Sequence, residues 1–344
     1  MKLFIRHSVI YMTGVTLMIS LFISCSNDFE LNTSADPVPV VWCLLNPDVN
    51  EQYVRLERSY LTDPAHPDDR PVTDSTVWNL PVTVYIEELS GGLPVQLVRF
   101  EPVTSPPKDS GYFPEDNLRL YYADFKPARL ATYRLYIHFT DDNRIVTGIT
   151  TVPGAPVVYD PLEVPGRKIN LQAGVQFTSR WAPGEGLGIF QGTYIMNYEE
   201  IVQEQTSINQ VYLKMSPILG LGADIEMSGF VSGNRFMEEM VKQVPVRDGA
   251  VRTMINVRFL LYKGGEELAL QVSPDLQQTT ISNSLNQYSN LVNGIGVFSS
   301  LQLVYVNNLQ LSNTTINELA NSELTRKLGF SDIHGDELNT GANE

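Results

Sequence analysis

Apolar and polar residues alternate along most of this chain, and Gly, Pro, Asn and Asp separate the alternating runs. Val82-Thr83-Val84-Tyr85-Ile86 is a typical run. A period of two places successive side chains on opposite sides of an extended strand, so each run can bury one face. The pattern therefore predicts a mainly β fold, built from short strands whose apolar faces pack together.

Residues 38–152 are predicted to form a domain of their own. Gly91-Gly92 is a hairpin signal inside it, and Asn46-Pro47-Asp48 is typical of a turn. The predicted strands are 38–45, 53–58, 82–86, 95–100, 118–125, 133–139 and 144–152. Seven short strands separated by turns indicate an immunoglobulin-like or fibronectin-like β-sandwich.

The segment 153–166 contains four prolines and two glycines and is predicted to be a linker. A β-rich C-terminal domain is expected over 167–330, and a mobile tail over 331–344. The predicted strands of the C-terminal domain are 171–181, 189–201, 211–215, 252–262, 267–272 and 298–309. Gly264-Gly265 is predicted to form the hairpin turn between 252–262 and 267–272. Two short helices are expected at 234–244, capped by Ser232 or Asn234, and at 314–327, ended by Gly329.

The first residues have the layout of an export signal. Lys2 and Arg6 precede the apolar run Val9–Ile23, and the small residue Ser24 is followed at once by Cys25. This order predicts a lipoprotein signal peptide over 1–24, cut before Cys25, whose thiol would then carry the lipid.

A buried helix or a membrane span would be the alternatives for this segment. The apolar run is shorter than the roughly 20 residues that cross a bilayer, and Phe22 stands where lipoprotein signals usually carry leucine. The following segment 25–37 is polar and acidic, which is typical of a flexible tether. The mature chain would therefore be held at a membrane through lipid on Cys25.

The charge and the cysteines exclude several function classes. The formal net charge is −15, and about −17 without the leader, so nucleic-acid binding is not expected. With Cys25 lipidated, Cys43 has no disulfide partner and is expected to be a small buried hydrophobe. The histidines of the mature chain (His66, His138 and His334) are scattered, so neither a metal site nor a cofactor is predicted.

One late segment is a candidate partner or ligand loop: Asn293, Gly294, Gly296 and Phe298. The two glycines permit backbone angles that other residues avoid. A turn or bulge before a strand explains the same residues structurally, and it is the favoured interpretation.

Two other motifs are weaker. Gly184-Glu185-Gly186-Leu187-Gly188 lacks the Lys-Ser/Thr pair of a phosphate loop and precedes a predicted strand. Asp63, Asp68, Asp69 and Asp74 match no calcium loop, so a solvated acidic loop is expected there.

Four stretches together resemble a known family. They are the leader ending at Cys25, the strand Val40–Pro47 followed by Tyr53–Leu56, the Tyr-x-Leu-x-Ile strand at 133–137, and the segment Tyr288–Phe298. The chain resembles an uncharacterised family of Bacteroidota outer-membrane lipoproteins with a domain of unknown function. The resemblance implies a lipid-anchored protein associated with TonB-dependent transport systems, and it supplies no catalytic residues.

Two further resemblances concern location and modification. The acidic residues Asp28 and Glu30 after the lipidated cysteine resemble the surface-export signals of Bacteroidota lipoproteins, which implies exposure at the cell surface. The alternative is a tether that is merely soluble. Asp74-Ser75-Thr76 resembles the O-glycosylation triplet of that phylum, with the glycan on Ser75.

The expected function is therefore a non-enzymatic accessory binding or assembly subunit of a transport system. The chain carries neither a Gly-x-Ser-x-Gly elbow nor a metalloprotease His pair. A stand-alone glycan-binding protein, with exposed aromatics lining a groove, is the alternative. A hydrolase with carboxylates gathered in a cleft is the third possibility.

Overall fold

The computed structural model describes residues 37–59, 78, 81–104, 119–141, 143–220, 225–272 and 288–332, which form a mainly β protein. The predicted alternation appears directly as burial. In β6 (Thr132–Phe139) every second side chain is buried, so Tyr133, Leu135 and Ile137 face the core. The mainly β fold class is therefore confirmed.

The predicted N-terminal strands are all present and enclose one core. They are β1 (Pro39–Leu45), β2 (Glu51–Arg58), β3 (Val82–Ser90), β4 (Leu93–Thr104), β5 (Arg119–Asp124), β6 and β7 (Ile145–Thr151). One layer contains β1, β2 and β5, and the other contains β3, β6 and β7. The long strand β4 pairs first with β3 and then with β5, so it passes from one layer to the other. Both layers bury side chains between them, Val41 from β1 and Ile137 from β6 among them. We call this part the first lobe.

A second core lies between the other end of the same 14-stranded sheet, which we call the large sheet, and a separate small sheet. The chain continues with β8 (Val157–Asp160), β9 (Lys168–Ile169), β10 (Gln176–Ala182), β11 (Gly188–Val202), β12 (Gln205–Lys214), β13 (Ile218–Gly220), β14 (Met227–Ser232), β15 (Val251–Gly264), β16 (Leu291–Val292) and β17 (Ile295–Leu311). The large sheet runs in the order β12-β11-β15-β17, and the small sheet in the order β14-β10-β8. Trp181 of the small sheet and Phe259 of the large one meet in this core. We call this part the second lobe.

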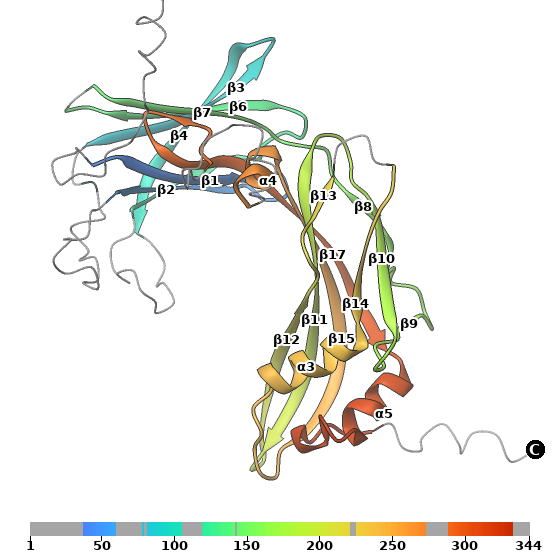
Figure 1. The fold of residues 1–344 in the computed structure, drawn as a ribbon. Helices are drawn as coiled ribbons and strands as arrows, with labels where there is room; N and C mark the ends of the chain where they lie inside the picture. Colours follow the sequence, from blue (N-terminus) through green and yellow to red (C-terminus); the bar gives the residue numbers. More distant parts are fainter. Residues whose placement is uncertain are drawn as a thin grey trace, which may run out of the picture.

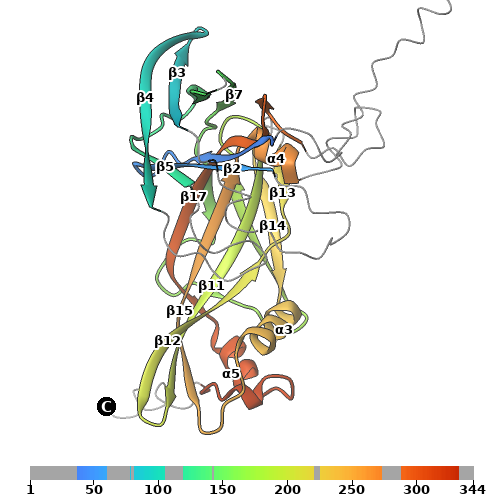
Figure 2. The same cartoon turned by 90° about the vertical axis from the view of Figure 1, so that its left-hand side faces the viewer.

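Strand β17 belongs to both lobes. Its residues 295–300 pair in parallel with β1, and its residues 301–309 pair antiparallel with β15. Phe298 is accordingly buried in the first core and Leu309 in the second. Figures 1 and 2 show the two lobes joined along this strand, with the second lobe extending away from the first. Residues 157–160 of the predicted linker form β8, and the division into domains at 153–166 stays a prediction.

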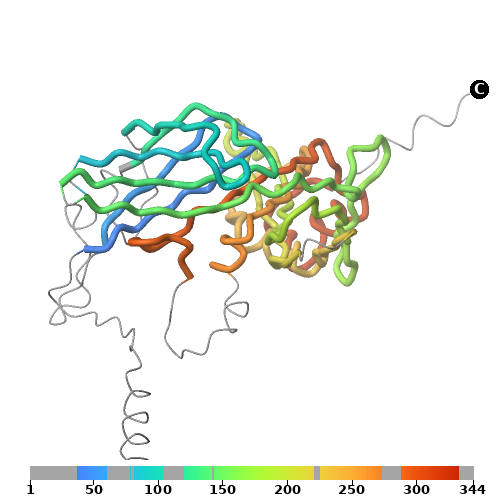
Figure 3. The backbone as a smooth tube through the Cα atoms, turned by 90° about the horizontal axis from the view of Figure 1, so that it is seen from above, coloured from blue at the N-terminus to red at the C-terminus, as the bar shows by residue number. Residues whose placement is uncertain are grey.

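Figure 3 shows the strands of the first lobe from above, with the late segment that contains β16 running along their flank. β16 pairs with β7, so residues far apart in the sequence complete the first lobe. No helix among the described residues is both long and apolar enough to cross a bilayer.

The two predicted helices are present. α3 (Gly233–Gln243) is capped by Ser232, whose Oγ accepts a hydrogen bond from the amide of Arg235 (3.3 Å), so Ser232 rather than Asn234 is the cap. α5 (Asn313–Asn321) ends earlier than predicted because Ser322 is extended, and the short 3-10 helix η2 (Arg326–Leu328) follows. Gly329 ends η2 with a left-handed φ of 70°, as expected.

The predicted hairpin at Gly264-Gly265 and its return strand 267–272 are wrong. The chain enters a third helix there, α4 (Glu266–Val272). A return strand would have to pair with β15, but β11 and β17 occupy both edges of β15. Two glutamates in the first turn favour a helix start, and Leu and Ala favour its continuation.

Candidate functional site

The predicted partner loop covers the turn between β16 and β17, with Asn293 and Gly294, and the first residues of β17, with Gly296 and Phe298. β16 pairs with β7 and β17 pairs with β1, so this turn joins the edges of the two layers of the first lobe. Asn293 has a left-handed φ of 60°, and its Nδ2 donates a hydrogen bond to the carbonyl oxygen of Ile145 (2.9 Å). The side chain therefore holds the turn against the start of β7.

Close packing surrounds both glycines of the loop, and it is much tighter at Gly296 than at Gly294. Gly296 has a φ of 119°, and a Cβ there would lie 2.0 Å from the carbonyl oxygen of Val41. A Cβ on Gly294 would lie 3.0 Å from Cγ1 of Val146 and 3.2 Å from the carbonyl oxygen of Pro39. The structural interpretation, a turn before a strand, accounts for both positions.

Phe298 is fully buried in the first core. Asn290 binds its backbone on both sides: Nδ2 donates to the Phe298 carbonyl (2.7 Å), and Oδ1 accepts from the Phe298 amide (3.0 Å). Phe298 therefore anchors the loop and is not exposed to a partner. Partner binding by the loop stays a prediction. The exposed residues of the loop, and not Phe298, would make the contact.

Apolar side chains surround the turn on its solvent side. Ile145, Val292 and Ile295 are 42%, 60% and 41% exposed. All three flank the turn: Ile145 accepts the hydrogen bond from Asn293, Val292 directly precedes Asn293, and Ile295 begins β17 opposite Val40 of β1. We call these three residues the tether-side patch, because the predicted tether 25–37 leads directly into β1.

Several predicted positions lie outside the described residues: Cys25, Ser75, Asp63, Asp68, Asp69 and Asp74. Cys43 is described and is buried in the first core, where burial raises the pKa of its thiol. It is therefore the small hydrophobe that the sequence predicts, because a reactive thiol needs a low pKa and exposure.

A buried lysine marks the junction between the lobes. Nζ of Lys263 donates to the carbonyl oxygens of Gly154 (2.8 Å), Pro183 (2.7 Å) and Glu185 (3.0 Å). The side chain is fully buried, and burial lowers its pKa to about 8. In the Gly184–Gly188 segment, the carbonyl of Glu185 therefore binds an ammonium group. The only sequence signal was a lysine directly after the apolar run 259–262.

The neighbouring polar groups also link the lobes. A carboxylate oxygen of Glu267 on α4 accepts hydrogen bonds from Oγ1 of Thr150 (2.7 Å) and Oγ of Ser299 (3.0 Å). Burial raises the pKa of Glu267. Nε2 of Gln302 donates to the carbonyl oxygen of Pro153 (2.6 Å). These hydrogen bonds connect β7, the segment that follows it, β17 and α4, so the groups stabilise the structure.

The hydrolase alternative requires free carboxylates in a cleft. The buried carboxylate of Glu200 is instead bound by the buried Arg252 (Nε, 2.7 Å) and by Arg247 (2.5 Å). This ion pair joins β11 to β15, and Arg252 also donates to the carbonyl oxygens of Pro245 and Leu328. The charge of Glu200 is thus balanced by two arginines, so Glu200 is not a free carboxylate of the kind that the hydrolase alternative requires.

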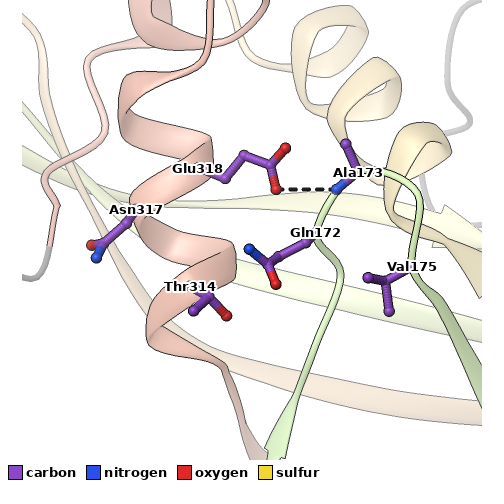
Figure 4. A pocket seen from close by; sticks show the side chains of 6 residues that line it. All are labelled: Gln172, Ala173, Val175, Thr314, Asn317 and Glu318. Atoms are coloured by element: carbon purple, nitrogen blue, oxygen red, sulfur yellow. Dashed lines mark hydrogen bonds between the residues drawn. The ribbon is translucent and has the colours of Figure 1, made fainter.

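A hollow of about 440 Å³ lies between α5 and residues 172–175. Figure 4 shows Glu318 reaching from α5 to the backbone of Ala173, whose amide donates to it (3.0 Å), with Gln172 between Glu318 and Thr314. The carboxylate thus fastens the loop to the helix. Among the described residues, no group of three or more His, Cys, Asp or Glu side chains could hold a metal ion.

Comparison with known proteins agrees with the resemblance in one respect, that the matching family is a domain of unknown function. None of the curated proteins searched matches the chain. The family model described as a domain of unknown function, DUF4249, matches residues 26–315. This range includes the strands of both lobes, the tether-side patch and the junction at Lys263, and it ends inside α5. The chain is therefore a member of the DUF4249 family.

Proposed function

We propose that this protein is a lipid-anchored accessory subunit of the outer membrane, which binds a TonB-dependent transport protein and has no catalytic activity of its own. The leader ending at Cys25 and the family resemblance support the location. The lipid would raise the local concentration of the protein near a membrane partner, so that a modest contact surface is sufficient for assembly.

The tether-side patch is the observation that carries the proposal. Ile145, Val292 and Ile295 are exposed beside the start of β1, where the tether joins the first lobe. Exposed apolar residues gathered at one place are typical of interaction sites. A patch at the anchored end of the molecule is well placed to contact a protein embedded in the same membrane.

Purification from native membranes in mild detergent tests this function. A TonB-dependent receptor is expected to co-purify with the unaltered protein. Much less receptor is expected to co-purify with the double variant Val292→Asp with Ile295→Asp. Ile208→Asp is the matched control, since Ile208 is 70% exposed on β12 in the second lobe. Equal recovery of the receptor by both variants would contradict the role of the patch.

The anchor is tested separately with Cys25→Ser. This variant is expected to leave the membrane fraction, because the acylated residue is removed. If Cys25→Ser stays in the membrane, the protein is held there by something other than lipid. Protease treatment of whole cells is expected to degrade the unaltered protein if it faces the medium, as the acidic residues after Cys25 imply.

A further inference from the structure

A groove of about 700 Å³ lies in the second lobe, between α3 and the sheet β12-β11-β15. We call it the α3 groove. It is lined by Gln191 and Thr193 of β11, Tyr212 and Lys214 of β12, Tyr262 of β15, and Arg235, Glu239, Lys242 and Gln243 of α3. Cross-strand pairing places Lys214 opposite Thr193 and Tyr262 opposite Gln191, so these side chains share one face of the sheet.

The wall formed by α3 is fixed to the sheet. Nε2 of Gln243 donates to the carbonyl oxygen of Tyr212 (2.9 Å), and Oε1 of Gln243 accepts from the amide of Tyr212 (2.9 Å). Gln243 thereby binds the backbone of the edge strand β12. The two sides of the groove are held together before any ligand arrives, which lowers the entropic cost of binding.

The groove is cationic in an acidic protein. It holds Lys214, Arg235 and Lys242 against one carboxylate, Glu239, while the whole chain has a net charge of −15. Nζ of Lys242 lies 3.6 Å from Oε1 of Glu239, and Oε2 of Glu239 accepts a hydrogen bond from Nε2 of Gln243 (2.6 Å). Within the described part of the chain, neither Arg235 nor Lys214 is paired with a carboxylate. Two cations thus remain to bind a negative group.

A buried hydroxyl in the groove has no partner. Thr193 is 3% exposed, and its Oγ1 makes no hydrogen bond. A buried polar atom without a partner is costly and uncommon, so its place in the wall of a groove points to a ligand that completes it. Nε2 of Gln191 is bound to the carbonyl oxygen of Met215 (3.1 Å), which leaves the amide oxygen as the group available to accept.

Aromatic rings complete the surface. Tyr212 is 42% exposed and Tyr262 is half-buried. Burial, with smaller contributions from the phenols of Tyr305 and Tyr212, raises the pKa of Tyr262. Cross-strand pairing places Tyr305 opposite Leu260, so Tyr305 and Tyr262 lie on the same face of the sheet. Tyrosine rings offer an apolar face together with a polar edge, which suits the alternating C–H and O–H groups of a sugar ring.

From these observations we propose that the α3 groove binds an acidic oligosaccharide. Its carboxylate is bound by Arg235 and Lys214, one sugar ring lies against Tyr212 and Tyr262, and a sugar hydroxyl completes the hydrogen bonding of Thr193. The cations alone would also accept an acidic peptide. The tyrosine rings, the hydroxyl of Thr193 and the amide of Gln191 favour a sugar. They suit the C–H and O–H groups of a sugar ring, which the carboxylate of an acidic peptide lacks. The site is independent of the proposed membrane partner, which contacts the first lobe.

Calorimetric titration of the full mature chain with tetragalacturonic acid tests the proposal. Binding is expected, and Arg235→Ala and Lys214→Ala are each expected to weaken it about tenfold or more. Arg326→Ala is the matched control, because Arg326 is exposed on η2 outside the groove, and it is expected to bind like the unaltered protein. Neutral maltotetraose and tetraglutamate are the comparison ligands and are expected to bind at least tenfold more weakly.

Thr193→Val separates binding from folding. Valine has the shape of threonine without the hydroxyl, so the variant is expected to unfold at the same temperature or higher, and to bind tetragalacturonate several-fold more weakly. Absence of tetragalacturonate binding by the unaltered chain would overturn the proposal. Equal or tighter binding of tetraglutamate would also overturn it, as would unchanged binding by Thr193→Val.

Discussion

At the scale of single residues, Lys263 has the most unusual surroundings among the described side chains discussed above. Its ammonium group is buried without a carboxylate and donates to three backbone carbonyls, from residues 154, 183 and 185. Burial disfavours the charged form, whereas the three carbonyls stabilise it. Because these carbonyls belong to the segments 153–155 and 183–186, one side chain fastens both to the end of β15.

Replacement of this lysine should change both stability and its pH dependence. Lys263→Met removes the lysine donor from the carbonyls of Gly154 and Pro183, whereas the carbonyl of Glu185 still accepts from the amide of Gly154 (2.9 Å). The variant is expected to lower the free energy of unfolding by about 2 kcal/mol at pH 7. The pKa of Lys263 is lowered to about 8 in the folded state, so between about pH 8 and the unfolded value near 10.4 the unfolded chain binds more protons. This residue therefore makes stability rise with pH over that window.

Urea unfolding at pH 8 and pH 9.5 measures the effect. The unaltered protein is expected to gain about 1.5 kcal/mol over this range relative to Lys263→Met, since the variant lacks the titrating group. Lys327→Met is the control, because Lys327 is exposed. The stability of this variant is expected to depend on pH as strongly as that of the unaltered protein. Parallel pH curves for the unaltered protein and Lys263→Met would show that the folded-state pKa is not lowered.

At the scale of elements, the turn between β16 and β17 closes the first lobe. Directly after the turn, β17 passes so near β1 that a side chain at Gly296 would overlap the carbonyl oxygen of Val41. That carbonyl belongs to the strand which pairs in parallel with β17. Movement away from the clash would therefore break strand pairing, and no flexible side chain can yield in its place.

Gly296→Ala is expected to destabilise the protein by about 3 kcal/mol or more, through the left-handed backbone and the 2.0 Å approach together. Gly166→Ala is the control, since Gly166 also has a positive φ (79°, against 119° at Gly296) but open space around its Cα. This second variant is expected to cost about 1 kcal/mol. Thermal unfolding of both proteins distinguishes a steric requirement at 296 from a merely conformational one. Similar losses in the two variants would contradict the close approach.

At the scale of the whole molecule, the lobes share a strand and a polar junction. β17 is paired with β1 at one end and with β15 at the other. Gln302, Lys263 and Glu267 add hydrogen bonds between segments of the two lobes. Neither lobe can lose its part of β17 without disturbing the other, so we expect the two lobes to unfold together.

Single-tryptophan proteins test this cooperativity. Trp78 is buried in the first core and Trp181 in the second. Each can be kept as the one fluorescent reporter by replacing the other two tryptophans, including Trp42, with phenylalanine. The two reporters are expected to show the same urea midpoint in their own proteins, once differences in overall stability are corrected with far-ultraviolet circular dichroism. A reporter midpoint that departs from the dichroism midpoint of the same protein would show that the lobes unfold separately.

Most strands could be predicted because their identity is a local property. The alternation in 82–86 and 133–137 requires a strand wherever the partner lies, since only an extended chain turns every second side chain inward. The caps at Ser232 and Gly329 are local in the same way. The strands β8, β9, β13, β14 and β16 were missed. In β9, β13 and β16, two or three residues carry no periodic signal. β8 lies in the Pro-rich segment predicted to be a linker, and β14 alternates over only six residues that include Gly229.

Pairing, in contrast, depends on residues far apart in the chain, and here the sequence was insufficient. The run 263–272 contains a good hairpin signal, yet it became α4 because both edges of β15 were already occupied. The same long-range pairing brought Val292 and Ile295 beside the start of β1 and placed Lys214 opposite Thr193. Local periodicity thus specified the strands, whereas competition for strand edges specified the shared sheet, the tether-side patch and the α3 groove.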